Sequence, residues 1–173
     1  MKKALILLLC AVMLTGCGNS TSQEVTTDGQ QFVITYDDFK DRLNQYLSKS
    51  DRGLKTITEF KEGEVSDNTV KPPKNYMTYE AELAKGLELE LRCIRGSENI
   101  SSVSLTLMPG SYNNVEGFTE SAANIIRVFA GDEERAITIF NELAPNRQIS
   151  QTVYRGISYQ LHSDTMLFLV RPE

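Results

Sequence analysis

Through the middle of the chain, apolar and polar residues alternate with a period of two. The segments YMTYEAEL, LELELRC and VSLTL, which begin at residues 76, 87 and 103, each place apolar side chains on one side and polar side chains on the other. This period is typical of antiparallel strands that bury one face and leave the other in water. The pattern therefore predicts a three-stranded antiparallel meander.

The connections between these segments set their register. Loops at residues 84–86 and 95–99 have lengths that are common for hairpins. They predict four facing pairs on the apolar side, namely Leu83 with Leu87, Ala81 with Leu89, Leu91 with Val103 and Leu89 with Leu105. A helix over residues 79–94 is the alternative, because Leu83, Leu87 and Leu91 also fit a period of four.

Three further stretches repeat their apolar residues at helical spacing. The first follows Thr35 and Asp38, which stand in the relation of a capping box, and ends before residue 51. Gly131 separates the other two, an acidic run at 132–134 begins the third, and Pro145 is expected to end it. The three apolar stripes are Phe39, Leu43, Tyr46 and Leu47; Phe118, Ala122, Ile125, Ile126 and Phe129; and Ala136, Ile139, Phe140 and Leu143.

The remaining segments complete an α+β domain. Residues 54–60, LKTITEF, are expected to form a strand, and the polar residues 61–75 a loop. The tail at residues 151–173 predicts a C-terminal hairpin that turns at His162-Ser163-Asp164. Its second strand, MLFLV, is apolar on both faces and so belongs inside a sheet. We expect an antiparallel meander sheet, completed by the C-terminal hairpin, with one N-terminal helix and a central helix pair packed on one face.

The start of the chain carries a different pattern. Lys2 and Lys3 precede an apolar run at 4–14, which is too short for a membrane-spanning helix, and this combination indicates a secretory signal peptide. The run ends in LTGC, Leu14-Thr15-Gly16-Cys17. This sequence resembles the lipobox of bacterial lipoproteins, which consists of an aliphatic residue, a small residue, glycine or alanine, and then cysteine.

The resemblance implies that the chain is cleaved before Cys17 and that the Cys17 sulfur carries lipid. Two or more acyl chains, such as palmitate, hold a protein stably on a bilayer. We therefore expect a signal peptide at 1–16, a lipidated flexible tether at 17–31 and one globular domain at 32–173. The domain would face outward from the cell membrane. In a cell with two membranes it would sit at the outer one, since Gly18 is not the aspartate typical of inner-membrane retention.

Charge and cysteine content narrow the function further. Removal of residues 1–16 takes away two lysines and lowers the formal net charge from −5 to −7, which argues against nucleic acid as a partner. The mature chain has the length of one domain, whereas the two-lobed solute-binding proteins of transporters need two. Cys93 is the only thiol of the expected domain, so neither a disulfide nor a zinc cluster is predicted, and no cofactor is expected.

The polar side of the meander carries the main candidate site. The predicted register sets Glu82 opposite Glu88 and Glu80 opposite Glu90. Like charges directly across an antiparallel pair are destabilising, so these rows call for a positive partner: Lys85, Arg92, a metal ion, or a cationic ligand or basic protein. A solvated face screened by Arg92 and water is the alternative interpretation.

Three other residues are candidates for a functional role. Tyr112 lies in the polar loop PGSYNN, a composition common at binding tips, although such a loop is also an ordinary connection. His162 is the only histidine, but adjacent Ser163 and Asp164 would point in divergent directions, so we interpret it as a turn residue rather than part of a triad. Cys93 lies on the apolar side of its strand, as a small core residue would.

We therefore expect a membrane-anchored, non-enzymatic lipoprotein whose domain binds a ligand or protein outside the membrane. The chain has no G-x-S-x-G, H-E-x-x-H or phosphate-binding glycine loop. Two alternatives stay open: a small cell-envelope hydrolase that uses a carboxylate pair, and a structural or assembly component of an envelope complex.

Overall fold

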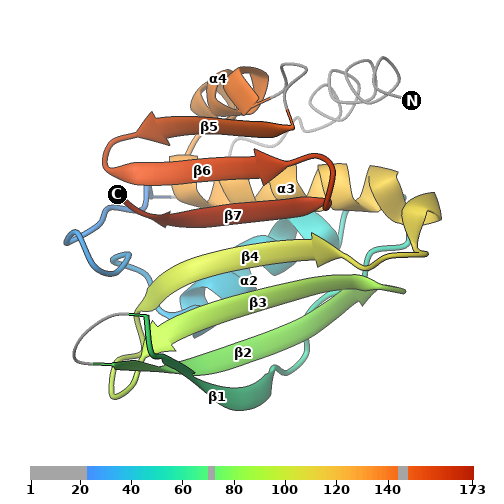
Figure 1. Cartoon of the computed structure of the whole chain (residues 1–173). Coiled ribbons are helices and arrows are strands. Elements are labelled where there is room, and N and C mark those ends of the chain that lie inside the picture. The colour runs from blue at the N-terminus through green and yellow to red at the C-terminus, as the bar shows by residue number, and fades with distance from the viewer. Residues whose placement is uncertain (1–22, 70–72, 144–147) are drawn as a thin grey trace.

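A seven-stranded antiparallel sheet and three helices make up the described part of the protein (Figure 1). The computed structural model describes residues 23–69, 73–143 and 148–173, so the expected signal peptide, the lipobox and Pro145 lie outside the described residues. The elements are α2 (Tyr36–Leu47), β1 (Lys61–Asp67), β2 (Lys74–Ala84), β3 (Leu87–Ile94), β4 (Ile100–Leu107), η2 (Tyr112–Asn114), α3 (Val115–Ala130), α4 (Glu133–Leu143), β5 (Ile149–Tyr154), β6 (Ile157–His162) and β7 (Leu167–Pro172).

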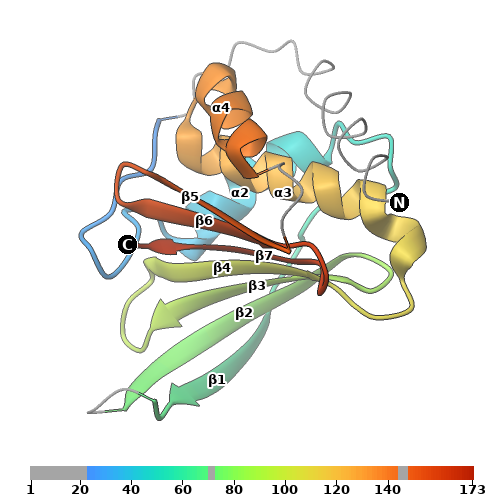
Figure 2. The same ribbon diagram turned by 45° about the horizontal axis from the view of Figure 1, so that its top comes forward.

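The strands follow the order β1-β2-β3-β4-β7-β6-β5, and the helices lie on one face of the sheet (Figure 2). This is a mixed α+β fold. Two three-stranded meanders, β2-β3-β4 and β5-β6-β7, meet where β4 pairs antiparallel with β7. The core fills the space between the helices and the facing side of the sheet.

The register of the first meander agrees with the predicted pairs in all but one place. Ala81 faces Leu89, and on the next strand Leu91 faces Val103 and Leu89 faces Leu105. The expected pair of Leu83 with Leu87 is wrong, because the register shifts after Glu82 and Ala84 faces Leu87 instead. Leu83 still lies in the core, so an irregular residue in the strand preserves its burial. The alternative helix over residues 79–94 is excluded, since β2 and β3 occupy this segment.

The strand expected at 54–60 and the loop expected at 61–75 are both wrong. Residues 54–60 are irregular, and both backbone groups of Ile57 bond to the side chain of Asn44 rather than to a strand. Residues 61–67 form β1, which pairs with β2 along its whole length. Nearly all of β1 is exposed on both faces, so it lacks the hydrophobic alternation by which a strand is recognised in a sequence.

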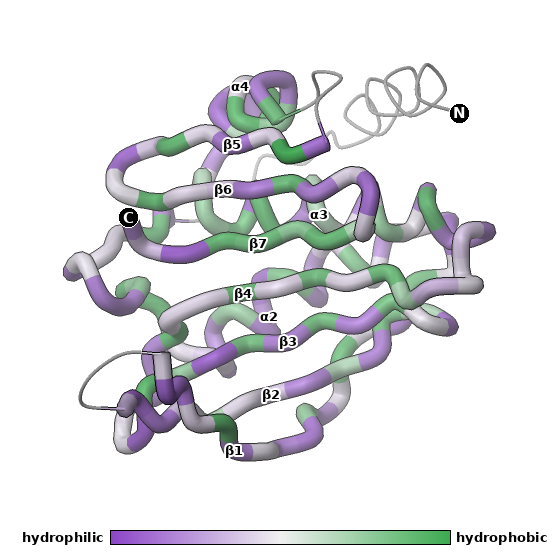
Figure 3. Tube along the Cα trace, viewed as in Figure 1, coloured by the Kyte–Doolittle hydropathy of each residue, from purple (hydrophilic) through white to green (hydrophobic). Residues whose placement is uncertain are grey.

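The C-terminal region has three strands rather than a hairpin. Residues 149–154 form β5, and Val153 faces solvent instead of sharing the core side of β6. His162 ends β6 and is not part of the turn that follows it. As its two apolar faces predict, β7 lies inside the sheet, between β4 and β6 (Figure 3).

The helices bury the stripes that their spacing predicts. Thr35 accepts the backbone N–H of Asp38 at the start of α2, as a capping residue does. Gly131 ends α3 with a φ of 77°, a left-handed conformation that glycine adopts without steric cost. All but three residues of α3 are buried, because the sheet covers it on one side and α2 and α4 cover it on the other.

The ordered domain begins before residue 32. Val25 is 3% exposed and belongs to the core, and its backbone N–H donates to the carbonyl of Phe129 at 3.1 Å. The Glu24 carboxylate lies 2.8 Å from Arg135 and 2.6 Å from Arg155. Residues 23–31 were expected to belong to a flexible tether, but residues 23–25 contact the helices, whereas most of residues 26–31 are exposed. The Val25 side chain and the Glu24 carboxylate make these contacts, and the polar composition of the segment does not indicate them.

Candidate functional site

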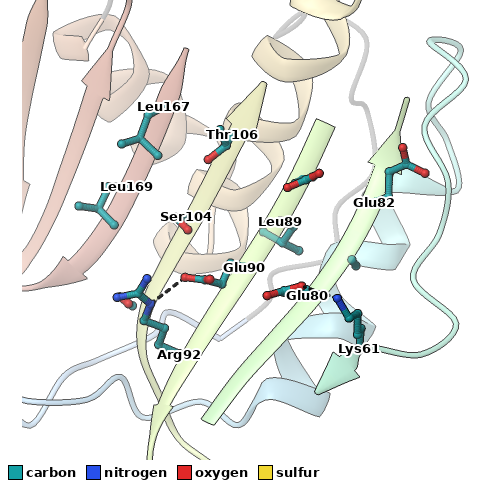
Figure 4. A pocket seen from close by; sticks show the side chains of 13 residues that line it. Lys61, Glu80, Glu82, Leu89, Glu90, Arg92, Ser104, Thr106, Leu167 and Leu169 are labelled. Atoms are coloured by element: carbon teal, nitrogen blue, oxygen red, sulfur yellow. Dashed lines mark hydrogen bonds and ion pairs between the residues drawn. The ribbon is translucent and has the colours of Figure 1, made fainter. Parts of the chain in front are cut away.

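The face of the sheet opposite the helices is uncovered by any described element and is hollowed into a groove of about 680 Å³ (Figure 4). Side chains of β1, β2, β3, β4 and β7 line it. The alternation of the strands dictates its composition, since every polar side chain of the groove is the neighbour of a core residue in sequence. The four glutamates singled out in the sequence are among the lining residues.

The lining residues form two rows that run across the strands. The register aligns Glu82, Glu88, Thr106 and Leu167 in one row, and Glu80, Glu90, Ser104 and Leu169 in the other. Adjacent strands lie about 4.8 Å apart, so each row passes from carboxylates to half-buried leucines within about 10 Å. The groove is therefore acidic on β2 and β3, hydroxylated on β4 and apolar on β7.

Three of the four glutamates have a cation of the chain as partner. Arg92 approaches Glu90 at 2.7 Å, Lys55 approaches Glu82 at 3.2 Å and Lys61 approaches Glu80 at 3.6 Å. Of the two internal partners that we expected, Arg92 is present, and no ion pair of Lys85 is found among the described residues. Within the same residues Glu88 has neither an ion pair nor a hydrogen bond, so it is the one carboxylate of the groove left for an external cation.

Glu82 is held in its ionised form. A hydrogen bond from the Gly86 backbone N–H, followed by the Lys55 ammonium, lowers the pKa of this carboxyl group. Gly86 adopts a φ of 70°, and a β-carbon there would lie 2.1 Å from the Ser111 hydroxyl, so the turn accepts only glycine without rearrangement.

The other candidate residues lie away from this groove. Tyr112 is 61% exposed in η2, where the chain passes from β4 to α3, and does not line the groove. Cys93 is fully buried, and this burial raises the pKa of its thiol to about 12, as expected for a core residue rather than a nucleophile. His162 is half-buried at the end of β6, opposite Leu167 and Ile149.

Sequence reasoning missed the β4 and β7 side of the groove. Ser104 and Thr106 alternate with core residues, so the sequence indicates that they share one face of β4. Leu167 and Leu169 alternate with Phe168 and Val170, so they share one face of β7 in the same way. What the sequence did not reveal is that β4 and β7 are neighbours. This pairing joins segments about 60 residues apart, and no local pattern specifies it.

No group of three or more histidine, cysteine, aspartate or glutamate side chains in the described residues has an arrangement that could hold a metal ion. In the same residues, no helix is both long and apolar enough to span a membrane. Comparisons of the chain with protein-family models, curated proteins and solved structures find no match.

Glu88→Lys is expected to raise the free energy of unfolding by about 0.5 kcal/mol, because it turns the facing pair with Glu82 from like to opposite charges. Urea unfolding measures the change. Glu90→Lys is the matched control: it also removes a like-charge pair, but it breaks the contact with Arg92, so little or no gain is expected. A loss of stability in Glu88→Lys would show that the repulsion is already relieved in the native protein.

Proposed function

We propose that the protein is a lipid-anchored, non-enzymatic lipoprotein outside the cytoplasm, and that its groove binds a ligand or protein segment that carries a positive charge next to an apolar group. The observation that carries the proposal is the pair of rows from glutamate to leucine on a sheet face that no described element covers. Lipid on Cys17, implied by the LTGC sequence, supplies the location.

The packing of residues 23–25 agrees with an anchor at Cys17. Arg42 donates to the Gln23 carbonyl at 2.7 Å, and Val25 lies against α3, so the ordered chain enters on the helix side of the sheet. Residues 18–22 can reach at most about 18 Å when fully extended. A domain attached this closely by its helix side keeps the opposite face, which contains the groove, free for a partner.

The groove chemistry favours an amphipathic cation. Glu88 offers a carboxylate that has no counterion among the described residues. Thr106 offers a hydroxyl group on the next strand, and Leu167 offers apolar surface one strand further. A cationic group paired with Glu88 would relieve the repulsion from Glu82, and an adjoining apolar group would cover Leu167 and Leu169. An aliphatic ammonium group or a lysine flanked by apolar residues has this shape.

The hydrolase alternative is less well supported by the same residues. A general acid needs a carboxyl group whose pKa is raised towards neutrality. The pKa of Glu82 is instead lowered by the Gly86 backbone N–H and by Lys55. Among the described residues, Glu80 and Glu90 are paired with Lys61 and Arg92.

The test is capture of partners from an envelope extract by the lipidated mature protein. We expect a captured component to be lost when Glu88→Lys is combined with Leu169→Lys, because these changes place positive charge on both the acidic and the apolar side of the groove. Asp41→Lys, an exposed acidic position on α2 with no ion pair among the described residues, is the control for the change of charge and should keep the component. Equal capture by all three proteins would rule out the groove as the binding site.

A further inference from the structure

The edge of β5 is the second feature of the sheet that no described strand covers. The Ser163 N–H donates to the Gln148 carbonyl at 2.9 Å, which fixes the hydrogen-bonding phase of the pairing between β5 and β6. Bonded and non-bonded positions alternate along an antiparallel pair, so Ser150, Thr152 and Tyr154 bond to β6. The residues between these positions are Ile149, Gln151 and Val153. Their backbone N–H and C=O groups point away from the sheet. Within the described residues these outward groups have no hydrogen-bonding partner.

The two edges of the sheet differ in their protection. Charged side chains block an edge against pairing with another strand, and β1 has four of them in seven residues: Lys61, Glu62, Glu64 and Asp67. In contrast, β5 has the sequence ISQTVY, with no charge, no proline and no glycine. Ile149 is 56% exposed and Val153 is 41% exposed on this edge. The β5 edge is therefore a template for strand addition.

Helix α4 limits what can occupy this edge. Thr152 on the helix side of β5 donates its hydroxyl hydrogen to Glu142, so this residue of α4 borders the strand. Glu134, Thr138 and Glu142 are exposed at spacings of four and share one face of the helix. A strand added outside β5 would turn one face to these carboxylates and the other to Ile149 and Val153.

We propose that the β5 edge binds an extended peptide segment of a partner protein by strand addition, with apolar side chains beside Ile149 and Val153 and lysine or arginine at the alternate positions facing α4. Backbone hydrogen bonds supply the affinity and the alternation supplies the specificity. A second copy of the chain fits less well. In Figure 1, α4 lies beyond β5 at this edge, and a second copy would bring its own acidic α4 against this helix.

The experiment uses the full mature chain made soluble by Cys17→Ala. The probe is a capped peptide in which valine and lysine alternate over about seven residues, the length of an ordinary strand. Amide hydrogen exchange of the free protein should be fast at Ile149, Gln151 and Val153 and slow at the residues between them. Bound peptide should slow the three fast amides about tenfold or more. The same peptide N-methylated at alternate amides should have no effect.

Gln151→Pro removes an outward N–H and leaves the backbone hydrogen bonds to β6 in place, although it also removes the side-chain hydrogen bond from Gln151 to Ser158. It should weaken peptide binding about tenfold or more. The second variant combines Ile149→Lys with Val153→Lys. The two added positive charges should weaken binding of the lysine-containing peptide. Val65→Lys changes an exposed valine on β1, outside the groove, and should leave the affinity unchanged. The proposal is overturned if the peptide protects no β5 amide, if both β5 variants bind normally, or if sedimentation shows a dimer that Gln151→Pro dissociates.

Discussion

Replacing Cys17 with alanine is expected to move the protein from the membrane fraction to the soluble fraction and to abolish labelling by radioactive palmitate. Each buried methylene group contributes about 0.8 kcal/mol, and stable attachment needs two or more acyl chains. Loss of the thioether therefore removes most of the binding free energy. The chain from Cys17 onward has a formal net charge of −7, so electrostatic attraction to anionic lipid cannot replace the lost acyl chains.

Cys93→Ala is the matched control, because it removes the other cysteine of the mature protein. Cys93 is fully buried in β3, and burial raises the pKa of its thiol to about 12, so it neither accepts lipid nor reacts readily in the folded protein. Cys93→Ala should stay in the membrane fraction and keep its label. A Cys17→Ala protein that remains membrane-bound in its native host would contradict the lipid anchor and the localisation that follows from it.

Glu133→Ala is expected to lower the free energy of unfolding by about 2–3 kcal/mol. Arg127 is 6% exposed, and two of its guanidinium nitrogens each donate to the Glu133 carboxylate at 2.8 Å. Its third nitrogen donates to the Asn124 side chain at 2.7 Å. Removing the carboxylate leaves a buried charge without its main counterion, which costs about 3–5 kcal/mol when both partners are buried. We expect less here because the Glu133 side chain is 39% exposed.

Two further variants separate this ion pair from other effects. Glu134→Ala changes the neighbouring residue of the same helical turn, which is exposed and has no ion pair among the described residues, so its effect should stay within about 0.5 kcal/mol. Arg127→Met combined with Glu133→Ala removes the buried charge itself and should recover part of the lost stability. Denaturant unfolding measures all three proteins. A double variant less stable than Glu133→Ala would contradict the assigned cause.

The sequence predicted the half of the groove that β2 and β3 form. Strict alternation over residues 76–107 placed Glu80 opposite Glu90 and Glu82 opposite Glu88, and both pairs are present. The cations beside them were only partly predictable. Arg92 follows two residues after its partner Glu90, whereas Lys55 and Lys61 come from segments whose structure was predicted wrongly. β1 has no buried face, and residues 54–60 bury Ile57 from an irregular backbone, so neither segment has a hydrophobic period that indicates its conformation.

By itself the sequence determined the α+β composition, most of the register of the first meander and the three helical stripes, and residues 14–17 carry a resemblance to the lipobox on which the proposed anchor rests. These features depend on residues close to one another in the chain, where periodicity and capping act. The tertiary structure alone decided that β4 pairs with β7, that residues 23–25 dock on the helices, and that β5 rather than β1 offers an unprotected edge. Each of these arrangements joins distant segments, and the free energy that selects them comes from burying whole faces together, which no short stretch of sequence encodes.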